Sequence, residues 1–210
     1  KYVILSSLSF KLDPGEVLLI SGKSGCGKST LVKIILGLLP PTGGHIICNG
    51  VNILEHNIQS FRKITGTVLQ GDSLLSGSLL YNISFDNTVS LDDVIHITKG
   101  LGIHEVINSL PMGYYSQVTD INAFLSVGQI QRILLARAIY RKPALLILDE
   151  ATSNLDHESE TQVIDYIATI PCAKIIISHK GEALRIADKI LYLDRATSYC
   201  KSNIHNKHCS

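Results

Sequence analysis

The segment with the clearest chemical potential is a glycine-rich stretch that follows an apolar run near the N-terminus. It fits the pattern G-x-x-x-x-G-K-[ST], and the residues expected to bind phosphate there are Gly22, Lys23, Ser24, Gly25, Cys26, Gly27, Lys28, Ser29 and Thr30. Glycines let successive backbone N–H groups curl around a polyphosphate, and a helix that follows directs its positive N-terminus at the same anion. We therefore expect Lys28 to contact the β- and γ-phosphates of a nucleotide and the Ser29 hydroxyl to bind Mg²⁺.

Cys26, inside this loop, has two interpretations. The one we favour is a small residue that packs under the loop. The alternative is a reactive thiol, because a neighbouring Lys28 and a helix N-terminus would both lower its pKa.

A pair of carboxylates ends an apolar run late in the chain. The segment LLILDE, residues 145–150, places four apolar residues before Asp149 and Glu150. A buried strand of this kind carries its last residues to the sheet edge where a phosphate-binding loop also lies. We expect Asp149 to hold Mg²⁺ through water, and Glu150 to orient the attacking water and accept its proton. Taken alone, the motif is also compatible with a buried strand that merely ends in acidic residues.

The segment LSVGQ, residues 125–129, opens a strongly helical stretch. Ser126 and Gln129 form an S-x-x-Q capping box, which explains both as parts of a helix start. The capping box does not explain Gly128, since glycine in a helix costs about 1 kcal/mol relative to alanine. We therefore expect Ser126, Gly128 and Gln129 to present a second helix N-terminus to a γ-phosphate.

Short apolar runs alternate with amphipathic stretches around these motifs. The expected strands are 4–12, 16–21, 65–69, 144–148, 174–178 and 190–193, with a hairpin over 45–53 that turns at Asn49-Gly50. The expected helices are 29–39, 91–101, 103–110, 127–140, 157–170 and 182–187. Strand–helix alternation at both ends predicts a parallel sheet with right-handed crossovers. The helical stretch in the middle indicates an inserted subdomain.

Composition narrows the classes of function. The 210 residues are 45% hydrophobic and 18% charged, with a net charge of +1. This balance argues against a protein that binds nucleic acid through general attraction to phosphates. No stretch approaches 18 uninterrupted apolar residues, so we expect no membrane-spanning segment. The cysteines have no metal-like spacing, and we interpret them as free thiols in a reducing compartment.

Together, the motifs resemble the nucleotide-binding domain of ATP-binding cassette (ABC) transporters. The resemblance covers about residues 5–193 and rests on the glycine-rich loop, on LSVGQ followed by IQRILLARAIYRKPALLILDE, and on ATSNLD after the acidic pair. It is nearest to the colicin V-like bacteriocin and peptide exporters, by LLARAIYRKP, DEATSNLD and PMGY.

The resemblance implies an α/β fold: a P-loop NTPase core with a mainly parallel sheet, an N-terminal antiparallel β part and an inserted α-helical subdomain. The expected domain is 1–194, with the core at about 1–71 and 141–194 and the helical subdomain at about 72–140. The polar tail, 195–210, is expected to be disordered.

The resemblance also implies roles for residues outside the three motifs. Gln70 matches the glutamine that contacts Mg²⁺ or water, and His179 matches the switch histidine that contacts the γ-phosphate. Ser153–Asp156 matches the D-loop at the dimer interface, although Asp156 is equally expected as a helix N-cap. The segment 72–82 resembles the stretch that contacts the coupling helices of exporters.

ATP and Mg²⁺ are the cofactors that the resemblance implies, and the expected assembly is a head-to-tail homodimer in which Ser126 and Gly128 act in trans. The expected partners are the transmembrane domains of an exporter at the cytoplasmic face of the inner membrane, either as a peripheral subunit or as the cytosolic part of a membrane protein. Membrane contact then occurs only through the transmembrane partner, and no nucleic acid is bound. The alternative is an ATP-gated regulatory module with little hydrolysis.

Two departures from the family pattern have consequences. Val127 stands where the signature usually has glycine, which predicts a weaker contact in trans. Tyr2 is too close to the first expected strand to stack on adenine, and the alternative is a stacking residue N-terminal to the chain.

Overall fold

The structure is a computed structural model that describes residues 4–6, 8–56, 58–85, 90–121, 124–194 and 199–202. Its centre is a six-stranded sheet of order β4-β5-β6-β1-β7-β8. The strands are β1 (Val17–Gly22), β4 (Thr65–Val68), β5 (Leu145–Asp149), β6 (Ala173–Ile177), β7 (Lys189–Leu193) and β8 (Tyr199–Ser202). All neighbouring strands are parallel except β7 and β8. The predicted α/β fold with a mainly parallel sheet is thus confirmed.

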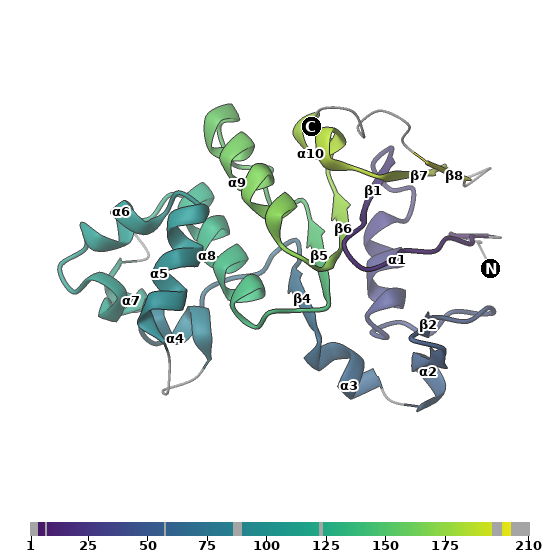
Figure 1. Ribbon diagram of the computed structural model, residues 1–210, viewed down its shortest axis with the longest axis horizontal. Helices are drawn as coiled ribbons and strands as arrows, with labels where there is room; N and C mark the ends of the chain where they lie inside the picture. Colours follow the sequence, from purple (N-terminus) through teal and green to yellow (C-terminus); the bar gives the residue numbers. More distant parts are fainter. Residues whose placement is uncertain are drawn as a thin grey trace.

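The central strand β1 shows why the sheet is buried on both faces. Val17 and Leu19 belong to one apolar core, whereas Leu18 and Ile20 belong to another. Side chains alternate across a strand, so an uninterrupted apolar run fills the space on both sides. The helix α1 (Lys28–Ile35) packs in the second core, and α8 (Val127–Tyr140) and α9 (His157–Thr169) pack in the first. Figure 1 shows α1 and α8 on opposite sides of the sheet.

The middle of the chain gathers into a helical lobe at one end of the molecule (Figure 1). Its elements are α4 (Leu79–Ser84), α5 (Leu91–Gly100), α6 (His104–Asn108), η1 (Gly113–Tyr115), α7 (Val118–Ile121) and α8. Arg137 connects α8 to α4 within this lobe. Its guanidinium donates to the backbone and side-chain oxygens of Asn82 at 2.8 and 2.5 Å and lies 5.1 Å from the centre of the Phe85 ring.

The antiparallel part is smaller than the sequence predicts. The hairpin at Asn49-Gly50 forms between β2 (Ile47–Cys48) and β3 (Val51–Asn52), with both turn residues at positive φ as a type I′ turn requires. The described residues of 4–12 contain no strand, which corrects that prediction. The short helices α2 (Ile53–His56) and α3 (Ile58–Lys63) follow the hairpin and were not predicted.

Two chain segments differ from the prediction, one at the end of α1 and one in the tail. Helix α1 ends at Ile35 rather than at residue 39, since Gly37 takes a φ of 62° and cannot continue a right-handed helix. The tail was predicted to be disordered, yet Tyr199–Ser202 forms β8 against β7. The last short helix, α10 (Glu182–Ile186), lies where it was predicted. None of the helices in the described ranges has the length and apolar character that crossing a bilayer requires.

Candidate active site

The glycine-rich loop connects β1 to α1 and leaves several backbone donors available. Gly25 and Gly27 have φ values of 76° and 106°, which favour glycine, and they turn the chain into the helix. Within the described residues, the amides of Gly25, Gly27 and Ser29 make no hydrogen bond to another backbone group. These N–H groups lie at the N-terminus of α1, where an anion is also favoured by the helix dipole. The loop is therefore suited to hold a polyphosphate.

Backbone carbonyls of the glycine-rich loop hold the Lys28 side chain in place. It is only 8% exposed, and its Nζ donates to the carbonyl oxygens of Gly22 at 2.7 Å and Lys23 at 3.1 Å. An ammonium group has three N–H donors. Two are used within the described chain, so one remains for a phosphate oxygen.

Cys26 lies beneath the loop and is 3% exposed. A Cβ atom placed on Gly22 would come within 2.7 Å of the Cys26 sulfur and within 2.4 Å of the Leu193 carbonyl oxygen. Glycine is needed at position 22 because the loop passes that close to β7. The burial of the thiol supports the packing interpretation of Cys26.

Ser29 and Asp149 adjoin each other, although 119 positions separate them in the sequence. The Ser29 hydroxyl lies near enough to the Asp149 carboxylate to lower its pKa, and this carboxylate ends β5 and is 6% exposed. Burial raises the pKa of Asp149, while Ser29 and the charge of Lys28 act in the opposite direction. A buried carboxylate and a hydroxyl are hard oxygen ligands of the kind Mg²⁺ prefers. The donor set thus fits the magnesium ion that the sequence predicts.

We expect Asp149→Asn to raise the melting temperature of the nucleotide-free chain at pH 7 by a few degrees. Because burial raises the pKa of Asp149 in the folded state, the charged form opposes folding above that pKa, and this cost is absent below the unfolded pKa. The gain should therefore shrink as the pH falls toward 4. Thermal unfolding without Mg²⁺ measures it, with the exposed Asp120→Asn as control. A lower melting temperature for Asp149→Asn at pH 7 would contradict the prediction.

Glu150 directly follows the last residue of β5, and its side chain contacts His179. Its φ of 55° is uncommon for a residue with a side chain. The backbone amide of Glu150 donates to Ile177 of β6 at 3.0 Å. The Glu150 Oε1 and His179 Nε2 atoms are 3.5 Å apart, and both side chains are partly exposed. The two residues predicted to act on water and on the γ-phosphate therefore lie side by side.

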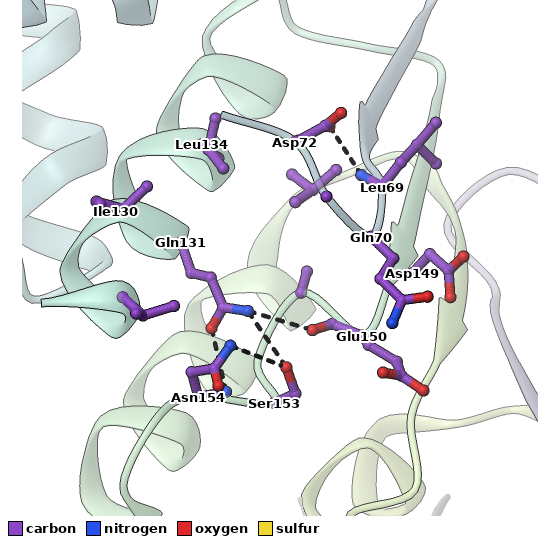
Figure 2. Close-up of a pocket in the computed structure, with 14 residues that line it drawn as sticks. Leu69, Gln70, Asp72, Ile130, Gln131, Leu134, Asp149, Glu150, Ser153 and Asn154 are labelled. Atoms are coloured by element: carbon purple, nitrogen blue, oxygen red, sulfur yellow. Dashed lines mark hydrogen bonds between the residues drawn. The ribbon is translucent and has the colours of Figure 1, made fainter. Parts of the chain in front are cut away.

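A cleft of about 380 Å³ opens beside these carboxylates. Asp149 and Glu150 line it together with Gln70, which follows β4 (Figure 2). Figure 2 shows the Gln70 amide beside both carboxylates. The cleft is also lined by Val127 of the signature segment, but by none of residues 22–30. The structure thus brings Gln70 and Val127 to one cleft with the acidic pair, while the phosphate-binding loop does not line that cleft.

The signature segment begins α8 as predicted. The Gln129 amide donates to Ser126 Oγ at 3.2 Å, and the Ser126 amide donates to Gln129 Oε1 at 2.9 Å, which completes the capping box. Packing within the chain explains the glycine at position 128, because a Cβ atom there would lie 2.8 Å from the Asn154 carbonyl oxygen. Ser126 and the 60%-exposed Val127 face solvent. The D-loop residue Asp156 accepts from the Ser159 amide at 2.9 Å, so it caps α9.

Gln131 is a residue that the sequence analysis missed. From α8, its Nε2 lies 3.4 Å from the Glu150 carbonyl oxygen and 3.3 Å from Ser153 Oγ, and its Oε1 accepts from the Asn154 amide at 3.2 Å (Figure 2). These contacts join the signature helix to the segment after Glu150. A signal was present, because residues three apart share a helix face and Gly128 already marks a close approach there.

Comparisons with known proteins show the family to which the chain belongs. The family model described as ABC transporter matches residues 5–153. The colicin V secretion/processing ATP-binding protein CvaB of Escherichia coli is 40% identical over 189 residues, which are 90% of this chain and 27% of that protein. The alpha-hemolysin translocation ATP-binding protein HlyB of Escherichia coli is 38% identical over 196 residues, 92% of this chain and 28% of that protein.

Among solved structures, a bacterial Atm1-family ABC exporter with ATP bound has a TM-score of 0.82 and 32% identity, and the match covers 91% of this chain and 34% of that one. The chain thus spans 27% to 34% of the length of these relatives. The matched region contains the phosphate-binding loop, the signature helix and the acidic pair. The chain therefore belongs to the ABC transporter family, and its sequence and fold are those of an exporter-type nucleotide-binding domain.

Proposed function

We propose that the chain binds MgATP and hydrolyses it in a head-to-tail dimer that powers export across a membrane. The observation that carries the proposal is the convergence of the Ser29–Asp149 pair and the Glu150–His179 pair at one edge of the sheet. One pair supplies ligands for a metal and the other supplies a base and a γ-phosphate contact. Phosphoryl transfer needs little more from a protein than positioning and charge stabilisation.

The chain's own groups divide the work of hydrolysis. The loop amides and Lys28 bind the phosphates, and the Glu150 carboxylate accepts the proton of the attacking water. His179 contacts the γ-phosphate and Gln70 contributes to the metal and water site. Ser29 and Asp149 would hold Mg²⁺, which when bound with ATP neutralises charge on the phosphate oxygens.

The dimer is supported by the separation of two helix N-termini. The loop before α1 and the signature start of α8 are both expected to contact a γ-phosphate, yet these helices lie on opposite faces of the sheet (Figure 1). One chain therefore supplies half of each site. Ser126, Gly128 and Gln129 of a second copy would complete it, and Val127 would make that contact weaker than glycine would.

The exported substrate is proposed to be a peptide or a bacteriocin-like molecule, because relatives at about 40% identity are named for colicin V and microcin secretion. The transmembrane domains of an exporter are the proposed partner. The chain would then work at the cytoplasmic face of the inner membrane and touch the membrane only through that partner. The exposed Leu75 and Tyr81, within residues 72–82, offer apolar surface for it.

The ATPase rate as a function of protein concentration tests the proposal. A dimeric site predicts that the rate per molecule rises with concentration in the presence of Mg²⁺. A rate per molecule that is independent of concentration, with no dimer under any nucleotide, would contradict it. Tight ATP binding with almost no turnover would favour an ATP-gated regulatory module instead.

A further inference from the structure

The turn that follows Glu150 is held by a cation from another loop. This turn, residues 151–155, connects Glu150 to the helix α9. Lys180 Nζ donates to the carbonyl oxygens of Thr152 at 3.1 Å and Leu155 at 2.8 Å. Lys180 directly follows His179, which itself contacts Glu150. One loop after β6 therefore contacts both Glu150 and the turn behind it.

A buried carboxylate fixes this cation in place. Glu160 of α9 is only 3% exposed, and its Oε2 lies 3.4 Å from Lys180 Nζ. Its other oxygen accepts from the Thr152 hydroxyl at 2.9 Å. Burying a carboxylate is costly unless it is paired and hydrogen-bonded, so Glu160 needs both partners. The three donors of the ammonium match three acceptors: Thr152 O, Leu155 O and Glu160.

The turn passes this restraint to Glu150. The Ser153 amide donates to the Glu150 carbonyl oxygen at 3.1 Å, and the Leu155 amide donates to Thr152 at 3.1 Å. The two carbonyls held by Lys180, those of Thr152 and Leu155, thus lie on either side of Ser153, whose amide donates to Glu150. Glu150 itself sits at a φ of 55°, a conformation that persists only where its surroundings enforce it.

We propose that Lys180 is a positioning residue for ATP hydrolysis: held by Glu160, its ammonium fixes the turn 151–155 and so sets the orientation of the Glu150 carboxylate. The inference rests on the proposed function. Because Lys180 and His179 are adjacent, any movement of His179 toward a bound phosphate also moves the group that holds the turn. Lys180 thereby links the contact with the γ-phosphate to residues 153–156, which face a second copy in the proposed dimer.

The test compares Lys180→Met, which keeps a long apolar stem but removes the donors, with Lys180→Arg, which keeps a charged donor. We expect Lys180→Met to lower kcat by about tenfold or more while the ATP dissociation constant stays within about twofold, and Lys180→Arg to recover most of the turnover. Glu160→Gln should give an intermediate loss, and it carries the test if Lys180→Met does not fold. The exposed Lys63→Met is the matched control and should behave like the wild type.

The readouts separate positioning from stability. The rate is expressed per folded molecule, with the melting temperature measured in parallel, because a merely structural lysine would change the folded fraction but not kcat. The inference about Lys180 would be overturned if folded Lys180→Met had the wild-type kcat, or if Lys180→Arg turned ATP over as slowly as Lys180→Met. Either result would leave the proposed function standing. A wild-type chain that binds ATP but does not turn it over at any concentration would overturn the proposed function and this inference with it.

Discussion

Replacing Glu150 by glutamine is expected to lower ATP turnover by about 100-fold or more, the range associated with loss of a general base. Glutamine has nearly the same shape as glutamate, so the side chain of Glu150→Gln can keep the contact in which Glu150 Oε1 lies 3.5 Å from His179 Nε2. The glutamine amide cannot, however, accept a proton at neutral pH. ATP binding should survive. The variant should therefore accumulate as an ATP-bound dimer, visible as a doubled mass in size-exclusion chromatography with light scattering.

The control for this experiment is Glu158→Gln, which removes one exposed carboxylate from the first turn of α9. It should hydrolyse ATP at the wild-type rate and form no long-lived dimer. Retention of wild-type turnover in Glu150→Gln would exclude Glu150 as the base. Low turnover in the wild type, unchanged in Glu150→Gln, is the result that the regulatory alternative predicts.

Replacing Lys28 by alanine is expected to weaken ATP binding by about 10- to 100-fold, since a charged hydrogen bond to phosphate is worth about 1.5–3 kcal/mol and each 1.4 kcal/mol is tenfold. The loss includes the N–H donor that Lys28 retains after bonding to Gly22 and Lys23. Equilibrium titration with a fluorescent ATP analogue measures the dissociation constant, and turnover should fall as well.

The matched control for Lys28→Ala is Lys63→Ala, which removes an exposed lysine from α3. Because both variants lose one positive charge, their comparison separates local phosphate contact from a change in net charge. Equal ATP affinity in Lys28→Ala and Lys63→Ala would show that the loop binds phosphate without its lysine. Adding the Lys28→Arg variant asks whether charge alone is sufficient.

Sequence patterns predicted best where local interactions decide the structure. Helix α8 has the predicted bounds, 127 to 140, because the capping box at Ser126 and Gln129 defines its start without help from distant residues. The hairpin at Asn49-Gly50 is equally local. Residues 4–12 also alternate, but a strand needs a neighbour to pair with, and alternation cannot show whether one is present.

The same distinction applies to the site. The loop, the acidic pair and the signature could be predicted because each is a contiguous motif. Gln131 and Lys180 were missed, because most of their partners are backbone N–H and C=O groups of Glu150 and of the turn 151–155, and a backbone group has no identity in a sequence. The tail strand β8 was missed for a similar reason, since its pairing with β7 depends on an available sheet edge rather than on its polar residues.

The strand order has a consequence for how the chain is made. β1 near the N-terminus pairs with β6 on one side and with β7 on the other, so Leu18 meets Ile175 and Lys189. Contacts between residues so far apart in the sequence are slow to form because a long loop must close first. During synthesis, β1 and the loop that follows it must wait for their partners until β6 and β7 have left the ribosome. Until then the apolar faces of β1 need protection from solvent. A chain that stops after α9 would contain the phosphate-binding loop, the signature segment and the D-loop, but it would lack β6 and β7, the two strands that pair with β1.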